Sequence, residues 1–341
     1  MPLRFIHTAD VHLTRDHPER LDALKKIGEK AENADYLLIT GDLFDKGADV
    51  EDLKSEVRSV FDNENFQTFL IPGNHDHNAF RSGDHLGNNI EILDDRIVSR
   101  ELGDVNLVAL PYTNESFEDK IEELSVKTED GKTNILMVHC TLKGGGSDFG
   151  DEEEYLPVSK EQLARTGYDY VLAGHIHSEA RKWQIGETVF AYSGSPVSIS
   201  KSETGVRHVW QLDTDTGMKT VPLNTEHYIR KEFDVVPEDE QEILEQIQTL
   251  SLKNSENATL LLEIDGFTDK QIPEFLDDVK SAVESSAGQI EVDHSLENMS
   301  AVIETDLYRN FKQKLDQRED VDKKRAEKQF LKGYSRFRRS S

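Results

Sequence analysis

The sequence predicts an α/β fold for its first two thirds, followed by a smaller α+β region and a helical end. Strand-sized runs rich in Val, Ile, Leu and aromatic residues recur along residues 1–225, and stretches with apolar residues at helical spacing separate the early ones. Such alternation is typical of βαβ units packed in layers. The length of 341 residues favours roughly two domains.

The first domain is expected at residues 1–225. Helices are expected at 18–33, where apolar residues follow a helical period, and at 49–61. A Gly-rich acidic stretch at 144–154 is expected to form a loop. The expected strands are residues 3–8, 36–40, 68–71, 105–110, 134–139, 168–173, 189–193 and 206–212.

A change in composition after Pro222 marks a second, small α+β domain, which is expected at residues 226–300. It follows the first domain without a long linker. Its pattern predicts, in order, a strand at 228–236, a helix at 238–250, a strand at 258–265, a helix at 269–285 and a strand at 289–294.

Residues 305–341 differ again, because they carry twelve basic and six acidic residues, a net charge of +6. Two amphipathic helices are expected there, one with an apolar stripe at 307–315 and one with a stripe at 330–337. Two interpretations stay open. The helices form a docking module for a partner, or they pack on the preceding domain.

Charge and composition restrict the class of protein. The chain has 40 Lys+Arg against 67 Asp+Glu, a net charge of −27, which at face value argues against a nucleic-acid binder. Its apolar runs are strand-sized, well short of the roughly 20 residues of a membrane span. The N-terminus has no signal-peptide core, and the single Cys140 excludes an internal disulfide framework. A soluble, cytoplasmic protein is therefore expected.

Five polar motifs come directly after predicted strands, where the sites of open α/β sheets assemble. Any one of them alone is commonplace or has a structural explanation, but their joint occurrence points to a site. Imidazole suits Zn and Fe, whereas carboxylate and amide oxygens suit Mn and Mg, so the mixture favours a pair of divalent ions. The motifs are Asp10-Val-His12, Gly41-Asp42, Gly73-Asn74-His75-Asp76, His139 and Gly174-His175-Ile176-His177.

Over residues 1–225 this set resembles the calcineurin-like binuclear metallophosphoesterase superfamily, which implies a β-sandwich flanked by helices. Further detail is similar to the SbcD-type nuclease subunits of the double-strand-break repair complex. That family has a small capping domain and a C-terminal helical segment, an order that residues 226–300 and 305–341 match. The motifs that carry the detail are Gly41-Asp-Leu-Phe-Asp45, Ile71-Pro-Gly-Asn-His-Asp76, His139-Cys-Thr-Leu142, Ala173-Gly-His-Ile-His177 and Tyr192-Ser-Gly-Ser-Pro196.

The resemblance implies a role for each site residue. Two divalent ions are expected, with Mn²⁺ as the metal. One ion would be held by Asp10, His12, Asp42 and His177, and the other by Asp42, Asn74, His139 and His175, so that Asp42 bridges them.

Three further residues follow from the same resemblance. His75 would donate a proton to the leaving oxygen or stabilise the transition state, and Asp76 would orient it. The alternative for Asp76 is a plain turn carboxylate. Asp45 stands where some relatives carry a substrate-contacting histidine, and a carboxylate there suits phosphate only when it is protonated or metal-bound. Asp45 is thus a substrate-binding candidate with an open role.

The function implied is a Mn-dependent DNA exonuclease and endonuclease subunit. It would act on duplex and single-stranded DNA ends with an SMC-like ATPase of the SbcC type, which the C-terminal helices would bind, and it would form a homodimer without a membrane partner. The alternatives are a small-molecule or cyclic-nucleotide phosphodiesterase of the same superfamily and a non-catalytic DNA-end tether. Given the net charge of −27, the isolated subunit is expected to bind DNA weakly and with strong salt dependence.

Overall fold

The computed structural model describes residues 2–47, 49–62, 65–80, 86–94, 96–144, 154–250, 257–283 and 289–339. The chain divides into two compact units, Met1–His227 and Tyr228–Ser341. Most of the expected acidic loop, residues 145–153, lies outside the described residues. No helix in these described ranges has the length and apolar character that crossing a membrane requires.

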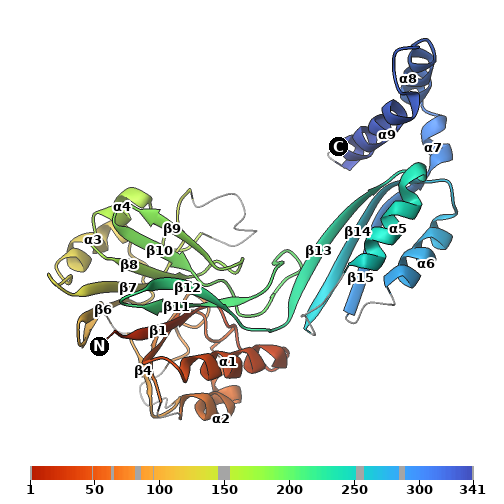
Figure 1. Ribbon diagram of the computed structural model, residues 1–341. Helices are drawn as coiled ribbons and strands as arrows, with labels where there is room; N and C mark the ends of the chain where they lie inside the picture. Colours follow the sequence, from red (N-terminus) through yellow and green to blue (C-terminus); the bar gives the residue numbers. More distant parts are fainter. Residues whose placement is uncertain are drawn as a thin grey trace. The chain divides into compact units, whose positions relative to one another are not determined.

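Two six-stranded sheets form the first unit (Figure 1). Their orders are β12-β11-β1-β2-β3-β4 and β5-β6-β7-β8-β10-β9, and the strands β1 to β4, like β6, β7, β8 and β10, run parallel. The remaining strands pair antiparallel at the edges. The strands are β1 Arg4–Thr8, β2 Tyr36–Thr40, β3 Gln67–Ile71, β4 Ile90–Ile92, β5 Val98–Leu102, β6 Val105–Leu110, β7 Thr133–His139, β8 Tyr170–Gly174, β9 Arg181–Ile185, β10 Thr188–Tyr192, β11 His208–Asp213 and β12 Gly217–Pro222.

Three apolar clusters fix the layers of this unit. Between the sheets, Phe5 and Leu38 of the first pack with Met137 and Leu172 of the second. The outer face of the first sheet is covered by α1 (Pro18–Ala31) and α2 (Asp49–Phe61), and that of the second by α3 (Phe117–Ser125) and α4 (Lys160–Ala164). The predicted α/β sandwich flanked by helices is confirmed.

Most of the elements that the sequence did not predict are short or lie at sheet edges, apart from α3, a helix of nine residues. Strands β4, β5, β9 and β12 have largely half-exposed or exposed residues, so they lack the continuous apolar run that marks a buried strand. Helix α4 has only five residues, and its start is fixed by a capping box between Ser159 and Gln162.

The second unit contains a three-stranded sheet of order β13-β14-β15, made of His227–Val235, Ala258–Thr268 and Gln289–Asn298. A 3-10 turn at Pro237–Asp239 leads into α5 (Glu240–Thr249), and α6 (Ile272–Val283) follows β14. Apolar residues of both helices, such as Ile247 and Phe275, pack on Leu262 and Ile264 of the sheet. The strand–helix–strand–helix–strand order agrees with the predicted pattern.

Three helices end the second unit: α7 (Met299–Ile303), α8 (Asp306–Asp316) and α9 (Lys323–Arg339). Tyr308 of α8 and Leu331 of α9 are buried in one cluster with Phe267 of β14. Leu307 and Phe337, by contrast, are 53% and 65% exposed. The helices therefore pack in part on their own unit, and each still presents an apolar residue to solvent.

Candidate metal centre

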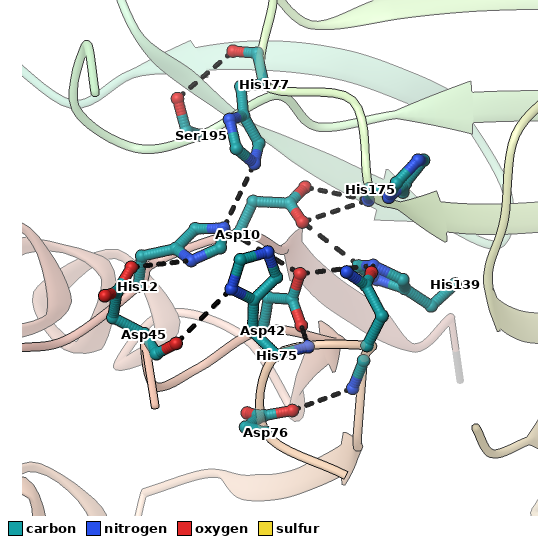
Figure 2. Close-up of polar contacts among 12 residues, drawn as sticks. Asp10, His12, Asp42, Asp45, His75, Asp76, His139, His175, His177 and Ser195 are labelled. Atoms are coloured by element: carbon teal, nitrogen blue, oxygen red, sulfur yellow. Dashed lines mark hydrogen bonds and ion pairs between the residues drawn. The ribbon is translucent and has the colours of Figure 1, made fainter. Parts of the chain in front are cut away.

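The polar motifs of the sequence meet where strands of both sheets end. Strands β1, β2 and β3 of the first sheet lead into Asp10, Asp42 and Asn74, and β7 and β8 of the second lead into His139 and His175. Figure 2 shows the carboxylates of Asp10 and Asp42 and the ring of His139 pointing toward one another, with the backbone amide of His175 directed at Asp10. Because β2 lies against both β7 and β8, the carboxyl ends of the two sheets come together at Asp42.

The backbone is in the left-handed region at four of the predicted ligands. The φ angles are +55° at Asp10, +50° at His12, +52° at Asp42 and +105° at His175. Non-glycine residues rarely adopt this conformation, and where they do it is typical of functional sites. Hydrogen bonds hold it here: the amide of His12 donates to the carbonyl of Asp42 over 3.0 Å, and the amide of His175 donates to the Asp10 carboxylate over 2.9 Å.

Close packing around the site also explains two glycines. A Cβ at Gly73 would lie 2.2 Å from Oδ1 of Asp42, and a Cβ at Gly174 would lie 2.1 Å from the carbonyl oxygen of Thr40. Both distances are shorter than any real contact, so a side chain at either position would displace the neighbouring strand ends. Glycine at these turns therefore allows the ligand-bearing loops to approach one another.

Two groups of donor atoms share this centre. Asp10, His12 and His177 form the first, with donor atoms all within 4.8 Å of one another, and Asp10, Asp42 and His139 form the second. The Nε2 atoms of His12 and His177 are 3.0 Å apart.

Oδ2 of Asp42 faces both groups. It lies 3.8 Å from Nε2 of His12 and 3.3 Å from Nε2 of His139. Nε2 of His139 is also 2.9 Å from Oδ1 of Asn74, and the rings of His139 and His175 are 5.3 Å apart. Donor atoms of six predicted ligands thus lie close together, and the ring of the seventh, His175, adjoins that of His139.

The electrostatics of the centre fit bound cations. Asp10 and Asp42 are 0% and 1% exposed, and burial raises the pKa of Asp10 above its ordinary value. Burial would raise the pKa of Asp42 too, but neighbouring His139 holds it well below the usual range. Burial alone would lower the pKa of His139, and Asp42 instead raises it to about 9. Adjacent buried carboxylates with imidazole donors are the chemistry that divalent ions compensate.

His75 occupies the exposed side of the site. Its ring is T-shaped against that of His12, with centroids 4.7 Å apart. Its Nδ1 lies 3.3 Å from the carbonyl oxygen of Asp45. An imidazole that borders the metal-ligand cluster and faces solvent can meet a substrate that approaches the centre.

Asp76, which was expected to orient His75, forms hydrogen bonds with the backbone of two loops. Its carboxylate accepts hydrogen bonds from the backbone amides of Leu43 (2.8 Å), Phe44 (3.2 Å) and Gly73 (2.8 Å). It therefore ties the loop after Asp42 to the loop before Asn74, and it positions ligands through the backbone.

The carboxylate of Asp45 faces the centre from the side of His12. Oδ1 of Asp45 is 3.4 Å from Nδ1 of His12, which lowers the pKa of Asp45. The donors of Asp45, His12 and His75 form a third group within 4.8 Å. Oδ1 is also 3.6 Å from the guanidinium of Arg20. The Asp45 side chain therefore contacts one predicted ligand, His12, and one buried arginine.

Three residues of the site were not predicted from the sequence: Arg20, Glu203 and Arg207. The one signal for Arg20 was its place on the buried face of α1 beside Ala23, Leu24 and Ile27. Glu203 and Arg207 lie beyond the last motif, in a segment without a recognisable pattern.

Comparison with known proteins agrees with this geometry. Residues 3–179 match the calcineurin-like phosphoesterase family. The chain is 26% identical over 306 residues to the SbcD subunit of nuclease SbcCD from Staphylococcus epidermidis, covering 75% of this chain and 77% of that protein. It is 23% identical over 247 residues to the uncharacterized metallophosphoesterase YhaO of Bacillus subtilis, covering 63% and 58%.

Among solved structures, purple acid phosphatase PPD1 from yellow lupin (Lupinus luteus) seeds has a TM-score of 0.46 and 12% identity, covering 65% of this chain and 52% of the other. The family match spans both sheets from β1 to β8 and contains all seven ligand candidates, of which His177 lies nearest its end. The chain belongs to the calcineurin-like phosphoesterase family.

Proposed function

We propose that this protein is the nuclease subunit of a DNA-end-processing complex, and that it hydrolyses phosphodiester bonds with two divalent ions. Mn²⁺ is the proposed metal. The observation that carries the proposal is the convergence of donor atoms from six predicted ligands on both sheets around Asp42, with the ring of His175 beside that of His139. The choice of DNA as substrate is supported by the similarity to the SbcD subunit of nuclease SbcCD. That similarity covers three quarters of each chain and so extends past the family match at residue 179.

In this proposal the ligands divide into two sets that share Asp42. Asp10, His12, Asp42 and His177 would hold one ion, and Asp42, Asn74, His139 and His175 the other. Two ions, when bound, supply a water activated near neutral pH and neutralise charge on the phosphoryl oxygens.

His75 is the proposed proton donor. Its imidazole lies at the open side of the centre, where it can protonate the leaving oxygen. Its backbone amide donates to Oδ1 of Asp42 over 2.9 Å, which fixes its main chain relative to the shared ligand. The side chain stays available for substrate.

Partners follow from the same proposal. The exposed apolar residues of α8 and α9, Leu307 and Phe337, would contribute to the surface that binds an SbcC-type ATPase, and the active form would be a homodimer. The two nuclease subunits would bind DNA ends weakly without the ATPase, because the chain carries a net charge of −27.

One experiment separates the proposed function from its alternatives. The purified chain, loaded with Mn²⁺, is assayed on a labelled blunt duplex, on a hairpin oligonucleotide and on bis-p-nitrophenyl phosphate, with Asp42→Asn as the inactive control. Cleavage of the oligonucleotides supports the nuclease. Turnover of bis-p-nitrophenyl phosphate alone favours a small-molecule phosphodiesterase, and binding of DNA without turnover of any substrate favours a tether.

A further inference from the structure

The two histidines proposed to share one ion have the same surroundings. The Nε2 atoms of His12 and His177 face each other at 3.0 Å, as Figure 2 shows. On the opposite side of each ring lies a carboxylate. Oδ1 of Asp45 is 3.4 Å from Nδ1 of His12, and Oε1 of Glu203 is 3.5 Å from Nδ1 of His177. Each imidazole is thus held between an acid and the metal centre.

A buried arginine holds the main chain of each of these histidines. Arg20 Nη1 donates to the carbonyl oxygen of His12 over 2.7 Å, and Arg207 Nη2 donates to the carbonyl oxygen of His177. Arg20 and Arg207 are 5% and 1% exposed.

Each arginine is also linked to the acid on the same histidine. Arg20 Nη1 lies 3.6 Å from Oδ1 of Asp45. Arg207 Nη2 donates to Oγ of Ser195 over 3.2 Å, and that hydroxyl donates to Oε2 of Glu203 over 3.1 Å. The arrangement occurs twice, on residues 165 positions apart in the chain.

Burial of these arginines is costly for the fold. Nε of Arg20 and Nη1 of Arg207 are among the buried polar atoms of the described chain without a hydrogen-bond partner. A buried guanidinium with incomplete hydrogen bonding destabilises a fold, so its role is better sought at the site it contacts. His139, which belongs to the other ligand set, is held differently: its Nδ1 lies 2.9 Å from the carbonyl oxygen of Thr40, and the acid near that nitrogen, Asp10 at 4.0 Å, is itself a predicted ligand.

We propose that Asp45 with Arg20, and Glu203 with Arg207, are two matched acid–arginine pairs that position His12 and His177 for one of the two ions. The inference rests on the proposed two-ion site and adds which residues orient its first ligand set. An Nδ1–H directed at the carboxylate leaves the Nε2 lone pair for the ion, and it fixes the plane of the ring. The arginine fixes the peptide from which the ring projects. Without the acid, the imidazole can rotate or change tautomer.

The test measures Mn²⁺ binding to the full chain, without DNA. Titration calorimetry gives the two affinities, and electron paramagnetic resonance distinguishes a coupled pair of ions from an isolated ion. Glu203→Gln should lower the affinity for one ion by about 10–100-fold and leave the affinity for the other unchanged. At low occupancy this variant should give the resonance signal of an isolated Mn²⁺. Asp45→Asn should lower the affinity for the same ion. The double variant of Asp45→Asn and Glu203→Gln should therefore still bind the other ion with wild-type affinity.

Glu240→Gln is the matched control. The side chains of Glu203 and Glu240 are both 11% exposed. Glu240 accepts a hydroxyl hydrogen bond from Thr268 over 2.6 Å and lies 3.9 Å from the Lys270 ammonium, but it belongs to the second unit. The Glu240→Gln variant should therefore bind both ions with the affinities of the wild type.

Two results would overturn the proposal. One is that Glu203→Gln and Asp45→Asn leave both affinities unchanged, and the other is that they lower the affinities for both ions equally. Should Glu203→Gln fail to fold, Asp45→Asn still decides, because the Asp45 side chain is 30% exposed. The readout is independent of cleavage. A chain with the expected binding pattern that leaves every DNA substrate intact would contradict the proposed function and leave the two acid–arginine pairs standing.

Discussion

Oδ1 of Asp42 accepts a hydrogen bond of 2.9 Å from the backbone amide of His75. The proposed shared ligand and the proposed proton donor are therefore joined through the main chain, while the imidazole of His75 remains exposed. Oδ2 of the same carboxylate faces His12 and His139. One aspartate thus sets the distance between the residues expected to bind metal and the residue expected to act on substrate.

His75→Ala should lower DNA cleavage by about 10²–10⁴-fold, the usual contribution of a general acid, and should leave Mn²⁺ affinity unchanged. The substitution removes the ring but keeps the amide that donates to Asp42. Cleavage rates under saturating Mn²⁺, with calorimetry in parallel, test both halves. Undiminished cleavage would remove His75 from the mechanism.

Asp76→Asn should act on the metal loops. Replacement of one carboxylate oxygen by an NH₂ group leaves at least one of the amides of Leu43, Phe44 and Gly73 facing a donor, so stability should fall by about 1–3 kcal/mol. Affinity for Mn²⁺ should fall with it, because those amides flank Asp42 and Asn74. Unfolding can be followed by tryptophan fluorescence, since Trp183 and Trp210 both lie in the first unit.

The role that the family resemblance implies for Asp76 gives a different result. If the carboxylate acts by orienting His75, Asp76→Asn should reduce the cleavage rate at saturating Mn²⁺ and leave both stability and metal affinity unchanged. The hydrogen bonds of Asp76 to three backbone amides favour the first outcome.

The sequence could indicate the buried strands and the ligand motifs because both depend on local pattern. Continuous apolar runs mark β2 and β7, and rare combinations such as Gly73-Asn74-His75-Asp76 stand out against any background. Edge strands such as β9 cannot be found in this way, since most of their residues are exposed and the pairing with a neighbouring strand stabilises them.

The supporting residues of the site could not be predicted for a related reason. Glu203 and Arg207 contact His177 only through the fold, and each stands in the sequence as an ordinary charged residue. The contact of Asp45 with Nδ1 of His12 crosses from one loop to another. Such long-range pairings leave no spacing to recognise.

His7 should make the first unit sensitive to acid. It is 0% exposed on β1, its Nε2 lies 2.9 Å from Oγ1 of Thr40, and burial lowers its pKa from 6.5 to about 3. Between those values the unfolded chain binds a proton that the native state does not. The stability contributed by neutral His7 is therefore complete above pH 6.5 and is lost as the pH falls toward 3.

The variant His7→Gln isolates this effect, because glutamine can still hydrogen-bond Thr40 and does not titrate. From pH 6.5 to pH 5 the wild type should lose about 1.5 kcal/mol more stability than the variant, measured by denaturant unfolding with tryptophan fluorescence and a chelator present. Parallel stability curves for the two proteins would contradict the prediction.

The last helices permit a sharp test of docking, because their two faces differ. The inner face is part of the second unit: Tyr308 and Leu331 are 7% and 1% exposed, and Lys328 and Lys332 pair with the two carboxylate oxygens of Asp239 at 2.5 and 3.1 Å. Deletion of residues 305–341 would strip this cover from Phe267 and confuse loss of docking with loss of folding.

Leu307→Asp with Phe337→Asp changes only exposed positions, so the melting temperature should stay within about 2 °C of the wild type, as expected for surface substitutions. Co-purification with the ATPase should be lost, because a charge in an apolar contact must be desolvated. Val126→Asp is the matched control: Val126 is 74% exposed and lies in the first unit. If the double variant keeps the ATPase, Leu307 and Phe337 have no part in docking. If Val126→Asp also loses it, the loss in the double variant is not specific to α8 and α9, and the docking assignment is contradicted.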